Sequence, residues 1–198
     1  MYIPNNLPLD YVVPYVYINN KYNKSIITVT ELLNDMNLKN TTTNRRWLNN
    51  IIQLMIDNKW INALKIKNSK YELYERYKLS PKSFKSYSFK DINTLMHIDG
   101  YDTVALVKYY IILVRTINYK TRVGCHSLNS LSEESGYNVL TLIKYNKLLE
   151  DNHIIYYVRF KNKMICNRYG LYGDRDLIDI EANKIKMRLT MENSCDKV

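Results

Sequence analysis

The chain has 198 residues, of which 46% are hydrophobic and 24% charged, so a packed core is expected and global disorder is excluded. The net charge of +10 favours a polyanionic partner such as nucleic acid or an acidic membrane surface, and nucleic acid stands ahead of a ribosome-like or solubility-driven basic surface. Cys125, Cys166 and Cys195 are widely spaced without a CxxC pair, which predicts reduced thiols in a cytoplasm rather than disulfides or a zinc site. The N-terminus lacks a signal-peptide pattern and the most apolar run, 103–117, is too short to span a bilayer, so we expect a cytoplasmic protein without a membrane partner.

The first half of the chain predicts three helices followed by a hairpin. An opening helix in residues 9–23 precedes a short β-branched stretch and a second helix within 25–38. Thr28 and Glu31 have the spacing of a capping box, in which each side chain satisfies the free backbone N–H of the other residue. The apolar residues of a third helix within 39–60 fall on one side at helical spacing: Trp47, Leu48, Ile51, Ile52 and Met55. The strands of the hairpin are residues 60–67 and 70–77, on either side of Asn68 and Ser69.

The second half repeats this order of elements. The expected helices lie in residues 103–117, 122–137 and 138–151, and the strands 153–160 and 164–172 flank a turn at Lys161, Asn162 and Lys163. Ser130 and Glu133 have capping-box spacing, and Gly136 can adopt the positive φ that a tight turn between helices requires. On the third helix of this half, Leu142, Tyr145, Leu148 and Leu149 are expected inside.

We therefore predict an α+β, mainly α chain with two winged helix-turn-helix domains in tandem, each with a three-helix core and a β-hairpin wing. The predicted domains are residues 1–78 and 92–173, joined by a polar linker at 79–91 that contains Pro81. Residues 174–198 are expected to form a C-terminal helix and a frayed tail. The apolar residues of this helix either cap a domain or pair with another chain: Ile178, Ile180, Ile185 and Met187.

A winged helix places its third helix in the major groove of DNA, so polar residues on the third helices are candidate base readers. They are Thr42, Thr43, Arg45, Arg46, Asn49 and Asn50 in the first domain, and Asn138, Thr141, Lys144 and Lys147 in the second. The wings add cations that neutralise phosphates: Lys65, Lys67, Lys70, Arg159, Lys161, Lys163 and Arg168. The same residues also suit the wet side of amphipathic helices and the protection of exposed strand edges, and both explanations can hold together.

The sequence carries no pattern typical of an enzyme. His97, His126 and His153 are scattered, no HExxH or His-hydrophobe-His pattern occurs, and no GxxxxGK[ST] phosphate loop is found. His97, Asp99 and Asp102 lie close in sequence but lack the further ligands that a metal site needs. We expect no catalysis, no metal and no cofactor.

The stretch SLNSLSEESGYNVLTLIKYNKLLEDNHIIYYVRF and the trailing NRYGLYGD resemble winged-helix proteins encoded by plasmids and phages of low-GC Gram-positive bacteria. The opening YIPNNL and YVVPYVYI are similar to the same group. The resemblance implies binding of double-stranded DNA, frequently as a dimer, in replication initiation or control, partition or transcription regulation. Initiators of this kind carry a helicase-loading domain for which no room remains here, and this puts the loading role in doubt.

Two other hypotheses remain open. Tandem winged helices also serve as protein-docking modules in segregation or replication complexes, where the surface need not be basic; host replication or partition proteins are candidate partners. Alternatively, only one domain reads DNA while the other forms a homodimer. Val139 and Leu140, at the position where the third helix meets bases, favour this last hypothesis for the second domain.

Overall fold

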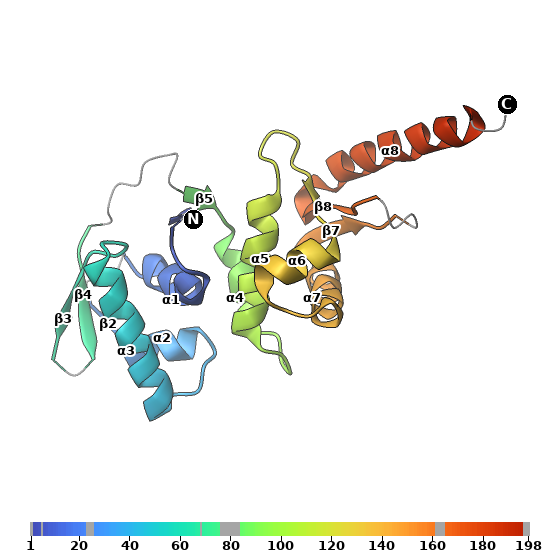
Figure 1. The fold of residues 1–198 in the computed structure, drawn as a ribbon. Coiled ribbons are helices and arrows are strands. Elements are labelled where there is room, and N and C mark those ends of the chain that lie inside the picture. Colours follow the sequence, from blue (N-terminus) through green and yellow to red (C-terminus); the bar gives the residue numbers. More distant parts are fainter. Residues whose placement is uncertain are drawn as a thin grey trace. The chain divides into compact units, whose positions relative to one another are not determined.

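The computed structural model describes residues 2–4, 6–22, 26–67, 69–75, 84–160 and 165–195. The chain divides into two compact units, a first unit of residues 1–108 and a second unit of residues 109–198. The fold is α+β and mainly α, as predicted (Figure 1). Within the described residues, no helix has the length and apolar character needed to cross a membrane.

The described residues of the first unit form strands and helices, the last of which, α5, continues into the second unit. They are β1 (Tyr2–Pro4), α1 (Leu9–Asn20), β2 (Ile26–Thr28), α2 (Val29–Asp35), α3 (Thr42–Asp57), β3 (Ala63–Ile66), β4 (Lys70–Leu73), β5 (Phe84–Ser86), α4 (Phe89–Met96) and α5 (Thr103–Thr116). Strands β2, β4 and β3 form an antiparallel sheet in that order, and β1 pairs with β5. The predicted hairpin is therefore present as β3 and β4.

Capping and apolar spacing account for the helices of the first unit. Thr28 accepts a hydrogen bond from the backbone N–H of Glu31 at 3.1 Å, which confirms the Thr28 half of the predicted capping box, and the Glu31 carboxylate accepts from Lys21 at 3.0 Å. Thr41 caps α3 by accepting from the N–H of Asn44. The predicted inner face of α3 is buried at Leu48, Ile51, Ile52 and Met55, whereas Trp47 is only half-buried. Burial of this one apolar side holds α3 on the core.

The first unit extends beyond the predicted domain 1–78. Part of the predicted linker 79–91 forms β5 and the start of α4, and Ser88 caps α4 by accepting from the N–H of Asp91 at 3.2 Å. Helix α4 buries its apolar residues Ile92, Leu95 and Met96. The Tyr17 hydroxyl of α1 donates to Asn93 at 3.0 Å, so α4 is attached to α1 by a hydrogen bond as well as by packing.

The second unit repeats the element order of the first. It contains the end of α5, β6 (Gly124–Cys125), α6 (Leu128–Ser135), α7 (Val139–Asp151), β7 (Ile155–Val158), β8 (Arg168–Leu171), the short 3-10 helix η2 (Tyr172–Asp174) and α8 (Arg175–Cys195). Its strands pair in the order β6, β8, β7, the counterpart of β2, β4, β3. Both units thus follow the order helix, strand, helix, helix, strand, strand, with the last strand in the middle of the sheet.

The predicted cap of α6 is wrong by three residues. Ser127, rather than Ser130, is the capping residue, and it accepts from the N–H of Ser130 at 3.1 Å. Ser127 and Ser130 are both followed three residues later by a possible partner, and the helix begins at Leu128, which places Leu131 in the core. Gly136 has φ 73° at the end of α6, which is the left-handed conformation predicted for it.

Aromatic side chains fill the core of the second unit. Tyr157 and Tyr169 stack with ring centroids 5.7 Å apart, and the Tyr169 hydroxyl hydrogen-bonds Thr116 on α5. A Cβ atom on Gly124 would lie 2.5 Å from the Tyr169 ring, so only glycine lets β6 approach this closely. The start of α8 covers the sheet through the buried residue Ile178.

Candidate nucleic-acid interface

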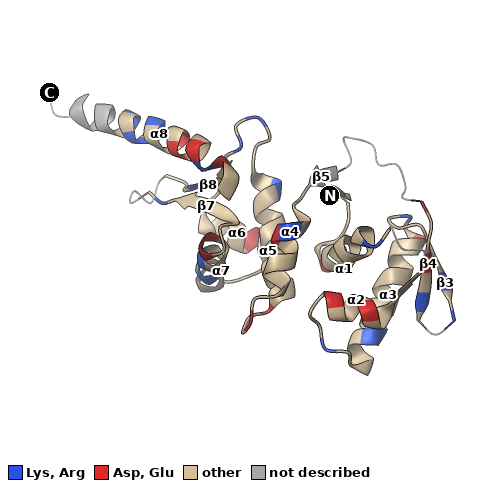
Figure 2. Cartoon of the chain, turned by 180° about the vertical axis from the view of Figure 1, so that it is seen from behind, with Lys and Arg blue, Asp and Glu red and all other residues tan. Residues whose placement is uncertain are grey.

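The net positive charge of the chain is concentrated in two stretches. Residues 42–73 run from the start of α3 to the end of β4, and residues 139–171 run from the start of α7 to the end of β8. Each stretch contains six Lys or Arg and two Asp or Glu, so the two together supply +8 of the net +10. The other 133 residues hold 17 basic and 15 acidic side chains. Blue segments on α3, β3 and β4 mark the first stretch in Figure 2.

The predicted base readers of the first unit lie on the side of α3 that faces away from the core. Thr42, Thr43, Arg45, Arg46 and Asn50 are exposed, and Asn49 is half-buried. The Arg45 Nε atom donates to Asn40 at 2.5 Å, while Arg46 has no hydrogen bond or ion pair with any described residue. No described residue therefore uses the guanidinium donors of Arg46, and they are available for a ligand. Asn50 lines a surface hollow of about 380 Å³ together with Tyr11 and Trp47.

Asn49 holds the hairpin against α3. The Tyr71 hydroxyl of β4 donates to Asn49 Oδ1 at 2.9 Å, and Asn49 Nδ2 donates to the carbonyl of Arg45 at 2.8 Å and lies 3.4 Å from Ser69 Oγ. Both ends of the amide are thus used within the protein. Asn49 positions the hairpin beside the exposed face of α3, a role that its spacing along the helix did not reveal.

We expect the Tyr71→Phe variant to lower the free energy of unfolding by about 1 to 2 kcal/mol, because Asn49 Oδ1 then loses its side-chain donor beside a fully buried ring. The matched control is Tyr74→Phe, which removes an exposed hydroxyl bonded to Glu72. Its expected effect is below about 0.5 kcal/mol. Urea denaturation followed by tryptophan fluorescence measures both values, and equal effects of the two variants would contradict the positioning role of Asn49.

The wing cations of the first unit lie on both faces of the sheet. Lys65 pairs with Tyr71 across the ladder, and because directly opposed residues point the same way, Lys65 lies on the face directed at α3. Lys70 pairs with Ile66 and lies on the opposite face. Lys67 is exposed directly after β3. The structure therefore brings Lys65, but not Lys70, onto the same side of the hairpin as α3.

The corresponding helix of the second unit has a different surface. Asn138 caps α7 by accepting from the N–H of Thr141 at 2.9 Å, and Thr141 is half-buried. Lys147 forms an ion pair with Asp151 at 3.1 Å, whereas Lys144 is exposed without a polar partner among the described residues. Two apolar residues stand on the same outer face: Leu140 is 72% exposed and Ile143 47%. The outer face of α7 is thus part cationic and part apolar.

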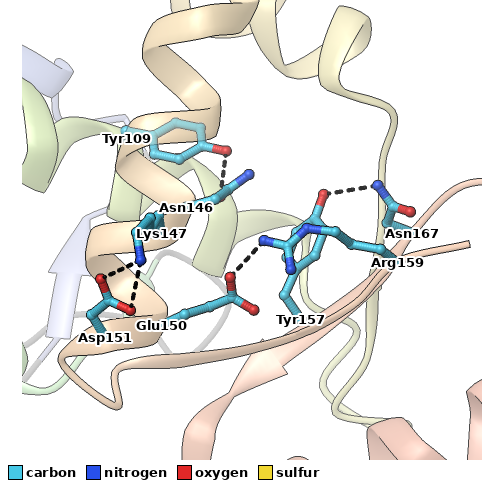
Figure 3. A network of polar contacts seen from close by, with 8 residues as sticks. All are labelled: Tyr109, Asn146, Lys147, Glu150, Asp151, Tyr157, Arg159 and Asn167. Atoms are coloured by element: carbon cyan, nitrogen blue, oxygen red, sulfur yellow. Dashed lines mark hydrogen bonds and ion pairs between the residues drawn. The ribbon is translucent and has the colours of Figure 1, made fainter.

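The second hairpin is tied to α7 at its base, as Figure 3 shows. The Arg159 guanidinium donates to Glu150 at 2.6 Å and lies over the Tyr157 ring, 5.2 Å from its centroid. The side chain of Asn167 donates to the Tyr157 hydroxyl. Arg168 Nη1 donates to the carbonyl of Cys166 at 2.6 Å. These two arginines have structural partners, and Lys161 and Lys163 lie outside the described residues.

Buried tyrosines connect α7 and the sheet of the second unit to α5. Burial raises the pKa of Tyr109 and of Tyr169 far above the ordinary range of a phenol. The Tyr109 hydroxyl donates to Asn146 Oδ1 at 2.9 Å, so the amide oxygen of this buried residue of α7 has a partner (Figure 3). Core packing, rather than base stacking, is thus the role of these two rings.

Among the described residues, no three His, Cys, Asp or Glu side chains gather closely enough to hold a metal ion. His97 binds the carbonyl of Asn93 through Nδ1 at 2.8 Å. The acidic residues of the adjacent loop, Asp99 and Asp102, border a hollow of about 360 Å³. Asp102 accepts a hydrogen bond from the N–H of Ala105 and so caps the start of α5.

The chain was compared with protein-family models and with curated proteins. Neither comparison finds a match.

Proposed function

We propose that each unit is a winged helix and that the chain binds double-stranded DNA through α3 with the β3–β4 hairpin and through α7 with the β7–β8 hairpin. The order of elements, repeated with the same order of strands, supports the winged-helix assignment. The observation that carries the DNA proposal is the distribution of charge: the third helices and their hairpins supply +8 of the net +10. Random surface charge would be spread over the whole chain.

In the proposed mode the first turns of α3 enter the major groove. Arg46 presents a fork of donors that fits guanine O6 and N7, and Thr42 and Thr43 stand beside it at the end of the helix that attracts phosphates. Lys65, on the α3 side of the hairpin, neutralises a backbone phosphate next to the groove. In this mode α3 contacts the bases, and the hairpin supplies the salt-dependent part of the binding affinity.

The proposed context is a plasmid or phage, where the protein acts in replication initiation or control, partition or transcription regulation. The resemblance of the stretch SLNSLSEESGYNVLTLIKYNKLLEDNHIIYYVRF supports this context. Linking two DNA-binding units in one chain raises the effective concentration of the second unit at its site once the first unit has bound.

A titration with fluorescent duplex DNA tests the proposal. We expect a duplex from the region upstream of the coding sequence to bind more tightly than a scrambled duplex of equal length. The logarithm of the binding constant is expected to fall linearly with the logarithm of salt concentration, with a slope of about −0.9 for each phosphate neutralised. Absence of binding to either duplex at low salt would contradict the proposal.

A second candidate function for the second unit is protein docking, favoured by the exposed Leu140 and Ile143 on α7. An apolar pair of this kind is typical of a protein interface and contributes little to a polar groove. If α7 binds protein, the DNA affinity rests on the first unit alone. Replacement of Lys144 by alanine is then expected to leave the DNA affinity measured in the titration unchanged.

A further inference from the structure

Helix α8 covers the second unit with one side and leaves its other side exposed. Ile178 and Ala182 are buried, and the Tyr156 hydroxyl donates to Asp179 at 3.0 Å. Three other apolar residues are exposed, Leu177 by 44%, Ile180 by 53% and Met187 by 64%, whereas Ile185 and Leu189 are half-buried. The prediction that this helix caps a domain or pairs with another chain thus applies to two different sides of the same helix.

The exposed apolar residues of α8 form a stripe along one side of the helix, with the exposed Lys184 between Ile180 and Met187. At 100° per residue, Leu177, Ile180 and Met187 fall on one side of the helix, opposite the side of Ile178 and Ala182. Leu177, Ile180, Lys184 and Met187 follow a spacing of three, four and three residues, which is the a/d spacing of a helix that pairs with another helix.

The charges of α8 are divided along its length. Residues 176–181 contain three acidic side chains and no basic one, and residues 182–188 contain three basic side chains and no acidic one. Figure 2 shows this division as red segments at the end of α8 near β8 and blue segments further along the helix. The basic residues do not compensate the helix dipole, because the last turn of α8 has none.

We propose that α8 pairs with α8 of a second copy of this chain, in antiparallel orientation. A two-fold axis between two identical helices places each residue against its counterpart in a self-complementary way. With the axis near residues 183 and 184, Ile180 of each chain meets Met187 of the other, and the acidic half of each helix faces the basic half of its partner. A parallel pair would instead place acid against acid.

The division of charge along α8 also favours a second α8 helix over DNA as the partner of this surface. The acidic residues 176–181 adjoin the basic residues on the same helix, so a phosphate backbone along α8 is repelled over half of its contact. A second α8 satisfies both halves at once and covers the apolar stripe.

The test measures the mass of the full-length protein without DNA by light scattering after size-exclusion chromatography. We expect the wild-type mass to reach twice the 23.6 kDa of one chain as the loading concentration rises. The variants D176K/E181K and K184E/R188E each give α8 two halves of like sign, so both are expected to dimerise at least ~10-fold more weakly, since ~1.4 kcal/mol of lost attraction produces that change. The combination of all four substitutions restores opposite signs, and we expect it to restore the dimer.

The matched control is K39E/K59E, which changes the net charge by the same amount as K184E/R188E but alters exposed lysines of the first unit. We expect it to dimerise like the wild type, and circular dichroism confirms that every variant is folded. A wild-type protein that stays monomeric at all concentrations, or a fourfold variant no better than its halves, would overturn the proposal. Because no DNA is present, either result leaves the DNA-binding proposal standing.

Discussion

We expect Arg46→Ala to weaken binding of the specific duplex by about 1–3 kcal/mol, the range of one base-reading arginine contact. Arg46 lies on the exposed face of α3 near its N-terminal end, and its guanidinium has no polar partner among the described residues. The variant therefore loses no polar contact with a described residue, and we expect its effect to fall on the complex with DNA. This is the largest effect on binding that we expect from a single substitution.

The control for Arg46→Ala is Lys59→Ala, which removes one exposed positive charge just beyond the other end of α3. We expect it to lower affinity for specific and scrambled duplexes alike and only slightly. Arg46→Lys keeps the charge but loses the fork that binds two atoms of one base, so it is expected to preserve the salt dependence and reduce sequence discrimination. Fluorescence anisotropy measures all three variants, and an Arg46→Ala protein that keeps wild-type affinity would show that α3 does not read bases.

The second large effect concerns stability. We expect Gly124→Ala to destabilise the second unit by about 1–3 kcal/mol, as overpacking of a core does. The new methyl carbon would lie 2.5 Å from the ring of Tyr169, which is itself held between Tyr157 and the hydroxyl of Thr116. A ring fixed on both sides cannot move aside without breaking one of these contacts.

Gly173→Ala serves as the control for Gly124→Ala, because nothing lies within 4 Å of a Cβ atom at Gly173. We expect it to be neutral or slightly stabilising, since alanine has fewer unfolded conformations than glycine. Both tryptophans, Trp47 and Trp60, lie in the first unit, so urea unfolding followed by tryptophan fluorescence reports that unit while far-UV circular dichroism reports both. A Gly124→Ala protein whose dichroism transition does not move would show that the sheet has room to adapt.

The order of elements was predictable from the sequence because it depends on local signals. The apolar spacing of Leu48, Ile51 and Ile52 marks the inner side of α3, and Gly136 marks the end of α6. Both are properties of one helix and its immediate neighbours. The outward side of α3 follows from the same spacing, and this is why most of its predicted readers are exposed.

Features that depend on distant partners were missed. β1 and β5 are three residues long and pair across about 80 positions of sequence, so neither has a local pattern that identifies it. Helix α4 did carry a signal, because Ser88 and Asp91 have the spacing of an N-cap and the apolar residues follow at helical spacing. The role of Asn49 depends on Tyr71, 22 residues away, and spacing along α3 alone cannot distinguish a base reader from a residue that holds the hairpin.

Helix α5 belongs to both compact units of the chain. The boundary between the two compact units falls after Lys108, within the helix Thr103–Thr116. A gene fragment that ends before this helix loses residues of the first unit, and one that ends within it divides a turn of helix between two polypeptides. Neither unit therefore contains the complete helix, because residues 103–108 belong to the first unit and residues 109–116 to the second.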